Sequence, residues 1–197
     1  MAATASRLTS VSRRLTAERG LHGFTIEELC AEVGVSRRTF FNYFPSKDEA
    51  VLGIDEVDDA KRLEQQFSAL GSRGWSAVIG DLVQLAVDHA EAAGFRVSEH
   101  SDFVTAIERE PRLLARVVGM TRDHEQALVL LVAAREGAAS DDPRARAVVT
   151  LFFAVLRAAT ERILQPGVND DFGTALYDSL AAIREVAAAP HPRKDHA

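Results

Sequence analysis

Cysteine is almost absent from this chain: Cys30 is the only one among 197 residues. A single thiol excludes a disulfide framework and a multi-cysteine zinc site, and it is compatible with a reducing compartment. Long apolar runs are also missing, because the most apolar stretch, 148–156, meets Arg157 and is too short to cross a bilayer. The first residues lack the apolar run of a secretory signal. We therefore expect a cytoplasmic protein that does not associate with membranes.

Catalytic motifs are absent as well. The six histidines are scattered, and the chain has no His-x-x-x-His pair, no glycine-rich phosphate loop and no nucleophile elbow. His89 with Glu91, and His124 with Glu125, stand at spacings from which helical side chains diverge. The sequence therefore predicts no enzyme activity, no metal site and no cofactor.

Helical periodicity is abundant. Hydrophobic residues make up 47% of the chain and charged residues 26%, the balance of a globular protein with a sizeable core. Apolar side chains recur every three or four residues, whereas strand-like alternation is nearly absent. This pattern predicts an all-α fold of about nine helices. The first is expected to end near Gly20, and the others to cover 26–33, 37–44, 47–70, 75–93, 101–109, 111–136, 143–164 and 170–188.

Charge is distributed unevenly along the chain. The net charge is −6, yet residues 1–47 carry +3 and residues 48–197 carry −9. A basic segment next to an acidic one is expected where only the basic segment meets a polyanion such as DNA. Chance clustering of solvated side chains explains the same numbers equally well, so charge alone does not decide.

The segment 25–44 has the pattern of a helix-turn-helix motif. Thr25 and Glu28 form a capping box at the start of one helix, Gly34 gives the turn its backbone freedom, and Ser36 caps a second, short helix. Apolar residues at four positions are expected to lock the two helices together: Leu29, Val33, Val35 and Phe40.

The first turn of the second helix carries the residues that would contact DNA. When such a helix enters the major groove, its N-terminal residues meet the base edges, and here these are Ser36, Arg37, Arg38 and Thr39. Other two-helix corners share this pattern, so the motif alone does not establish DNA binding.

A family resemblance adds to this interpretation. Residues 34–47, Gly-Val-Ser-Arg-Arg-Thr-Phe-Phe-Asn-Tyr-Phe-Pro-Ser-Lys, closely resemble the recognition-helix signature of the tetracycline-repressor (TetR) family of transcriptional regulators. Residues 17–25 resemble the segment that joins the first two helices of that family, and the similarity extends over 6–52. Phe41 departs from the pattern, since many members have Tyr there, and the missing hydroxyl removes a phosphate hydrogen bond.

The resemblance implies roles for individual residues. Contacts to base edges are implied for Arg37, Arg38 and Thr39, with Asn42 as an additional candidate; Arg pairs bidentately with guanine, and the Thr methyl contacts thymine. Contacts to phosphates are implied for Thr25, Ser36, Tyr43 and Lys47. Capping alone also accounts for Thr25 and Ser36, and the two roles are compatible.

The two C-terminal helices, 143–164 and 170–188, are apolar over more surface than one internal seam needs. Burial inside the monomer is one explanation. The resemblance implies another, in which they pair with their copies in a four-helix homodimer bundle whose two-fold axis matches a palindromic operator.

The resemblance further implies a ligand cavity in the middle of the chain. Its candidate lining residues, each also explicable as ordinary core, are Trp75, Ile79, Leu82, Phe103, Ile107, Leu114, Val117, Val118 and Met120. Segments 110–116 and 142–146 look like a TetR branch thought to sense acyl-CoA-like molecules. The candidates to bind the phosphates of such a ligand are Arg112, Arg116 and Arg122, although solvated helix charge also explains these arginines.

With this resemblance, we expect a helix-turn-helix DNA-binding domain at residues 1–47, with its motif at 25–44, and a ligand-binding and dimerisation domain at 48–197. The expected function is that of a ligand-responsive regulator, a repressor, that binds a palindromic operator as a dimer. A small hydrophobic or acyl-CoA-like effector would release it by shifting the helix expected at 46–70. The alternative is a helical ligand-binding protein without a DNA function.

Overall fold

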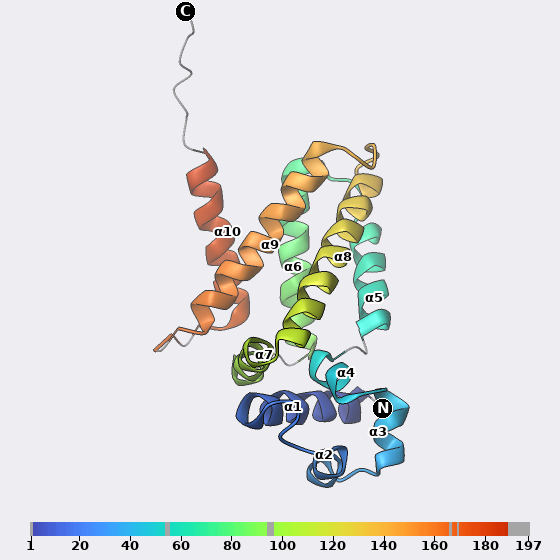
Figure 1. The fold of residues 1–197 in the computed structure, drawn as a ribbon. Helices are drawn as coiled ribbons and strands as arrows, with labels where there is room; N and C mark the ends of the chain where they lie inside the picture. The colour runs from blue at the N-terminus through green and yellow to red at the C-terminus, as the bar shows by residue number, and fades with distance from the viewer. Residues whose placement is uncertain (1, 54–55, 94–96, 166, 169, 189–197) are drawn as a thin grey trace, which may run out of the picture.

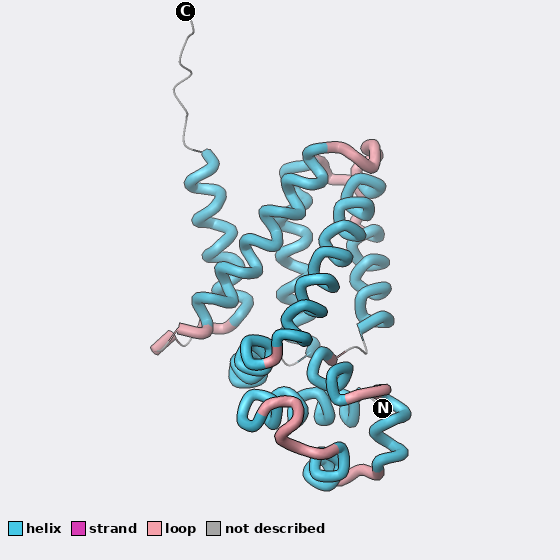
Figure 2. Tube along the Cα trace, viewed as in Figure 1, coloured by secondary structure: helices cyan, strands magenta, loops and turns pink. Residues whose placement is uncertain are grey.

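The computed structural model describes residues 2–53, 56–93, 97–165, 167–168 and 170–188. Within these ranges the chain forms ten helices and no strand, which confirms the predicted all-α class (Figure 1). Figure 2 shows that the described connections between them are short loops. The helices are α1 (Ala2–Arg19), α2 (Ile26–Val33), α3 (Arg37–Tyr43), α4 (Lys47–Leu52), α5 (Glu56–Ala69), α6 (Trp75–Ala93), α7 (Val97–Arg109), α8 (Pro111–Arg135), α9 (Pro143–Ile163) and α10 (Phe172–Ala188).

The first three helices form a small unit, here called the head, at the bottom of Figure 1. α1 packs against α2, and α2 against α3. Their apolar faces meet in one core because each helix repeats apolar residues at helical spacing. The buried members of this core are Ala5, Leu8, Leu15, Phe24, Leu29, Cys30, Val33, Phe40, Phe44 and Ala50.

The remaining helices from α5 onward form the body. α9 packs against α8, α6 and α10, and α6 also contacts α5 and α10. One large core joins α5, α6, α8, α9 and α10, with fully buried side chains such as Phe67, Val78, Val132 and Leu176 at its centre. None of the described helices is long and apolar enough to cross a membrane.

Two predicted helix boundaries are wrong. A single helix over 47–70 was expected, but α4 ends at Leu52, because the next residue, Gly53, has a φ of 77° in the left-handed region and closes the helix. α5 begins at Glu56, and residues 54–55 lie outside the described ranges. In addition, α7 begins at Val97 rather than at 101. Both errors concern the link between head and body.

Head and body meet at a junction built from α1, α4, α7 and α8. α7 lies along α1, and α4 packs against α1 and contacts α8. A separate apolar cluster, here called the junction cluster, fills the space between them. Its buried residues are Leu21, Val51, Leu52, Ala106, Ile107 and Leu113, with Ala17, Phe103, Val117 and Met120 packed at its margin.

Polar contacts between side chains and backbone reinforce this junction. Arg109 Nη1 donates to the carbonyls of Ala17 and Glu18 at 3.1 Å each, which satisfies the C-terminal end of α1. The next residue, Glu110, accepts a hydrogen bond from the Leu21 amide through Oε1 at 2.6 Å. Arg13 on α1 donates to the last carbonyls of α4, that of Val51 at 2.9 Å among them.

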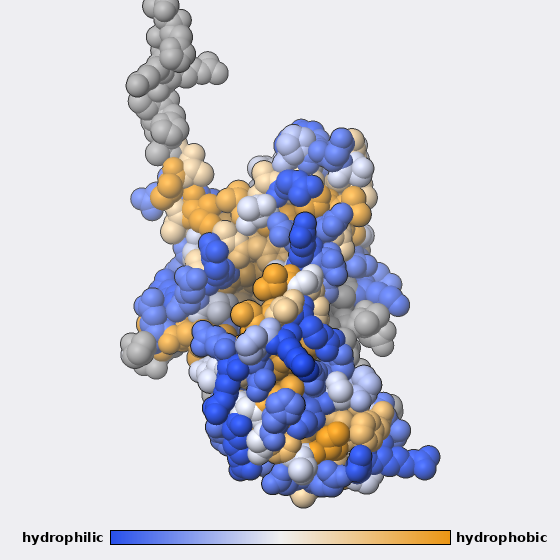
Figure 3. Space-filling view, in the orientation of Figure 1, coloured by the Kyte–Doolittle hydropathy of each residue, from blue (hydrophilic) through white to orange (hydrophobic). Residues whose placement is uncertain are grey.

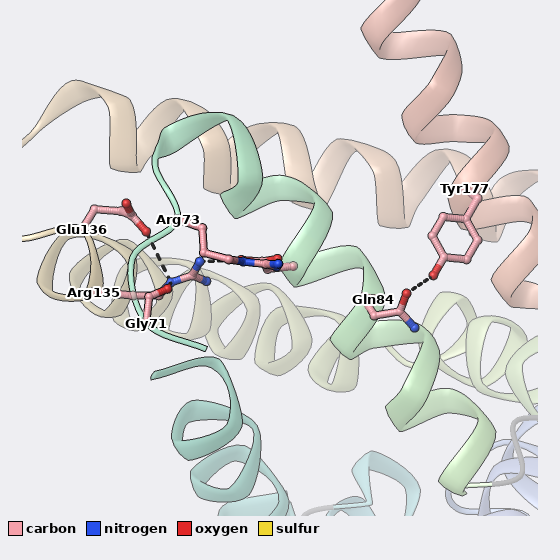
Figure 4. Close-up of polar contacts among 7 residues, drawn as sticks. Gly71, Arg73, Gln84, Arg135, Glu136 and Tyr177 are labelled. Carbon is pink, nitrogen blue, oxygen red and sulfur yellow. Dashed lines mark hydrogen bonds and ion pairs between the residues drawn. The ribbon is translucent and has the colours of Figure 1, made fainter. Parts of the chain in front are cut away.

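The opposite end of the body is held by a buried ionic network. Asp81 on α6 is only 4% exposed and pairs with both Arg73 and Arg135. The Arg135 side chain, at the end of α8, is 1% exposed and also donates to the carbonyl of Gly71 at 2.8 Å. Figure 4 shows Arg135 and Arg73 converging here from α8 and from the α5–α6 loop. The network therefore ties that loop to two long helices.

Candidate nucleic-acid interface

The start of α2 is fixed by a complete capping box. The Thr25 hydroxyl accepts from the Glu28 amide at 3.1 Å and donates to Glu28 Oε2, and the Thr25 amide donates to the same carboxylate at 2.6 Å. The amide and hydroxyl of Thr25 together hold the pKa of Glu28 below its usual value. Because the Thr25 hydroxyl proton is engaged here, its first role in this structure is that of a helix cap.

The turn and the start of α3 follow the predicted motif. Gly34 ends α2 in the left-handed conformation, with φ of 78°. Ser36 then caps α3 by accepting from the Thr39 amide at 3.0 Å. The Ser36 and Thr39 hydroxyl oxygens are 2.8 Å apart and share one proton, so the second hydroxyl proton is available to a ligand. Phe40 is fully buried below this turn and anchors α3 on the head core.

Arg37 and Arg38 both project outward, but they are held differently. Arg37 Nη1 donates to Glu27 Oε1, on the first turn of α2, at 2.5 Å. Its guanidinium carbon also lies 5.5 Å from the centre of the Phe41 ring, which is 45% exposed. Arg38 is exposed and makes no hydrogen bond or ion pair to any residue that the structure describes. The sequence pattern implied the same role for both arginines and contained no sign of Glu27, because no local pattern links positions ten residues apart.

The other candidates on α3 lie on the same exposed side or at its edge. Asn42 is exposed, and Thr39 and Tyr43 are half-buried. Tyr43 packs against the head core, so its ring is fixed in place. The structure thus brings together on one side of α3 the residues of this helix that the resemblance implies as DNA contacts.

Lys47, implied to contact phosphate, has partners within the protein. Its ammonium donates to the carbonyls of Leu21 at 2.5 Å and Phe24 at 2.7 Å, and it lies 4.5 Å from the centre of the Phe24 ring. These contacts fix the loop between α1 and α2 from the start of α4. One of its three N–H donors remains for a ligand. The sequence contained no signal of this role, because backbone carbonyls have no side-chain signature.

The positive charge of the head is only partly available to DNA. Arg14 is paired with both Glu18 and Glu32, and these hydrogen bonds, that to Glu18 foremost, raise its pKa. Arg13 donates its hydrogen bonds to the carbonyls at the end of α4. The count of +3 for residues 1–47 therefore does not measure the charge exposed beside α3.

The nine candidate lining residues of the body are not gathered around one space. Three belong to the body core or pack on it: Trp75, Ile79 and Leu82. Four belong to the junction cluster: Phe103, Ile107, Val117 and Met120. The remaining two, Leu114 and Val118, are exposed by 46% and 61%.

The three arginines considered for ligand phosphates are also separated. Arg116 forms an ion pair with Glu49 of α4 at 2.5 Å, whereas Arg112 is exposed at the start of α8. Arg122 lines an open groove of about 320 Å³ between α8 and α9. The other groove residues are Glu125, Gln126, Val129 and Arg146. Among the described residues no group of three or more His, Cys, Asp or Glu side chains is arranged to hold a metal ion.

A capped helix, a glycine turn and a short helix with two outward arginines, joined to a helical body, define a helix-turn-helix DNA-binding protein. Residues 8–52 match the family model "Bacterial regulatory proteins, tetR family", and residues 76–188 match the model of the MftR C-terminal domain. The HTH-type transcriptional regulator TcmR of Streptomyces glaucescens is 31% identical over 161 residues, which are 80% of this chain and 71% of TcmR. The chain therefore belongs to the tetR family of transcriptional regulators, as the sequence resemblance indicated.

Proposed function

We propose that this protein is a cytoplasmic, ligand-responsive repressor that binds a palindromic DNA operator as a homodimer, and that it acts by binding rather than by catalysis. The observation that carries the proposal is the exposed, capped first turn of α3, with both guanidinium groups outward, in a chain of the tetR family. We place the DNA-binding domain at residues 1–47 and the ligand-binding and dimerisation domain at residues 48–197.

In this proposal α3 enters the major groove. Arg37, Arg38 and Thr39 contact base edges, with Asn42 one turn further along the helix. Phosphates are contacted by the free hydroxyl proton of the Ser36–Thr39 pair, by the Tyr43 hydroxyl and by the third N–H of Lys47. Thr25 contributes to the phosphate-facing surface chiefly by fixing the start of α2.

The homodimer is supported by apolar side chains that α9 and α10 leave uncovered. Leu151 on α9 is 42% exposed, and Tyr177 and Val186 on α10 are 43% and 79% exposed. On the face drawn in Figure 3, apolar colour extends over α9 and α10, and smaller apolar patches lie elsewhere on the body and on the head. Exposed apolar surface of this kind marks an interface. A two-fold axis through these helices would place two copies of α3 about 34–36 Å apart, one turn of DNA.

For an effector to release the protein from DNA, a change in the body must displace the head, and the junction connects the two structurally. A ligand acts only through different affinities for two states. α4 is held on one side by Arg13 of α1 and on the other by the Glu49–Arg116 ion pair with α8. We propose that ligand binding in the body displaces α8 and with it α4, so that the two copies of α3 no longer fit successive grooves.

The effector is proposed to be a small hydrophobic or acyl-CoA-like molecule. The groove between α8 and α9 is the reason to expect an anionic group on the effector. Arg122 and Arg146 face this groove and have no partner among the described residues. The exposed Val118, one helical turn before Arg122, offers apolar surface beside them.

The proposal is tested by selecting bound duplexes from a random pool. The wild-type protein should enrich a palindrome, whereas the variant with Arg37→Ala and Arg38→Ala together should enrich none at the same helix content. Static light scattering should give twice the mass of the chain at micromolar concentration. Acyl-CoAs and fatty acids are then screened for release of the selected duplex. Absence of salt-dependent binding to any duplex would instead favour a helical ligand-binding protein without a DNA function.

A further inference from the structure

Glu27 places a carboxylate on the surface that faces DNA in the proposed complex. It is the second residue of α2, and its side chain is 58% exposed. DNA carries one negative charge per about 1.7 Å of its axis, so a carboxylate at this surface opposes binding to every sequence. Such a residue needs a compensating role.

Among the acidic residues of the head, Glu27 is distinguished by its partner. Glu18 and Glu32 pair with Arg14 on α1, and Glu28 caps α2. Glu27 pairs with Arg37, on the first turn of the recognition helix. It is thus the acidic side chain of the described head that contacts a proposed base-reading residue.

The geometry of this pair leaves part of the guanidinium free. Glu27 Oε1 engages Nη1 of Arg37, and the Phe41 ring lies beneath the guanidinium carbon at 5.5 Å. A guanidinium has five donors, so the N–H groups on Nη2 and Nε remain available. Two such donors are enough for the bidentate contact of arginine with O6 and N7 of guanine.

We propose that Glu27 is a positioning residue that raises sequence specificity, an inference that rests on the proposed operator binding. It holds Arg37 in one orientation with its free edge outward, and its negative charge weakens the attraction of Arg37 to phosphates. Arg38 has no such restraint and contributes to both specific and non-specific binding. The two adjacent arginines therefore serve different purposes.

The test compares Glu27→Gln with Glu32→Gln, which removes the same charge from the same helix without touching α3. Affinities are measured for the selected operator and for a scrambled duplex at several salt concentrations. Both variants should bind the scrambled duplex more tightly. Only Glu27→Gln should lower the ratio of specific to non-specific affinity, by about tenfold, the lower part of the range for one base contact. An equal change of this ratio in both variants would overturn the inference.

A second comparison separates positioning from a general effect on the fold. In an Arg37→Ala background, Glu27→Gln should leave the affinity ratio unchanged, because no guanidinium remains to be oriented. A tenfold loss in that background as well would show that Glu27 acts elsewhere. If the wild-type protein selects no operator, the proposed function fails before Glu27 is tested; if it selects one and Glu27→Gln matches Glu32→Gln, only this inference fails.

Discussion

At the scale of single residues, Arg38 is a proposed DNA contact whose side chain has no restraining partner among the described residues. Because its guanidinium has no described partner, Arg38→Ala removes a base contact and little else. We expect a loss of about 1–3 kcal/mol in operator binding and a relaxed preference at one base pair. Binding to a panel of singly substituted operators measures both. Arg19→Ala, which removes an equal charge from the end of α1, should leave base preference intact; an unaltered preference in Arg38→Ala would contradict the assignment.

Lys47 should affect two properties at once. Lys47→Ala leaves the carbonyls of Leu21 and Phe24 without their charged donor, and hydrogen bonds to charged groups contribute about 1.5–3 kcal/mol each. We expect the free energy of unfolding, measured in urea, to fall by about 3 kcal/mol, the lower end of the sum for two such bonds. If its third N–H also reaches phosphate, the slope of log K against log salt should decrease by about 1 for all sequences alike. Unchanged stability would refute the role in the loop.

The chemistry of these residues was predictable from sequence, but their partners were not. The recognition-helix pattern indicated Arg37 and Arg38, since the first turn of such a helix meets the bases. The ion pair of Arg37 with Glu27 spans ten residues, and the contact of Lys47 with Leu21 spans 26. Only the packing of α2, α3 and α4 brings such positions together.

At the scale of secondary-structure elements, the capping box of α2 makes this helix sensitive to acid. The pKa of Glu28 is lower in the folded protein than in the unfolded chain. Its contribution to stability is therefore present above the ordinary glutamate pKa and is lost as the pH falls through the lowered value. We expect the stability difference between wild type and Glu28→Ala to be largest near neutral pH and to vanish in acid.

The matched control for this prediction is Glu28→Gln. Glutamine still accepts the hydrogen bonds of the box but does not titrate, so this contribution should not vary with pH. Urea denaturation from neutral pH into the acid range measures all three proteins. If Glu28→Gln loses stability over that range as steeply as the wild type does, the pH dependence of stability arises from groups other than Glu28.

The elements themselves were largely predictable. Thr25 and Ser36 cap α2 and α3 as expected, and Ser46 caps α4 in the same way, because capping is decided by side chains within three residues of the helix start. Gly53 was overlooked because the periodicity continues on both sides of it. An Ala at Gly53 would be strained by the φ of 77°, and its Cβ would lie 2.9 Å from Nη2 of Arg13. The glycine therefore permits the close approach of α1.

At the scale of the whole molecule, the buried Asp81 network links the α5–α6 loop to α6 and α8, so that its loss should lower stability. Asp81→Ala leaves the Arg135 guanidinium buried without its main counter-charge. Removing one partner of a buried ion pair destabilises a protein by about 3–5 kcal/mol, and we expect that loss in urea denaturation at fixed protein concentration. Arg157→Ala, which breaks an exposed pair with Glu161, should change stability by about 1 kcal/mol or less. A loss of only about 1 kcal/mol or less in Asp81→Ala would mean that the network is not a stabilising element.

The whole-molecule arrangement also explains why the predicted ligand-lining set was scattered. Helical periodicity identifies the apolar face of α6, α7 or α8, but it does not say which other helix covers that face. Phe103 and Ile107 pack toward α1 and α4, whereas Trp75 and Leu82 pack toward α9. Candidates chosen from separate helices therefore fell into two clusters.

Local sequence was sufficient to predict the helical class, most helix ends and the residue types presented by the recognition helix, since periodicity and capping act over a few neighbouring positions. Tertiary structure alone decided that Glu27 restrains one arginine while the other stays free, that Lys47 binds loop carbonyls, and that Glu110 on the body holds the Leu21 amide of the head, 89 residues away. These contacts depend on how helices distant in sequence pack against one another. Because the hydrophobic effect that drives this packing is non-directional, the apolar pattern of one helix does not specify which other helix it meets.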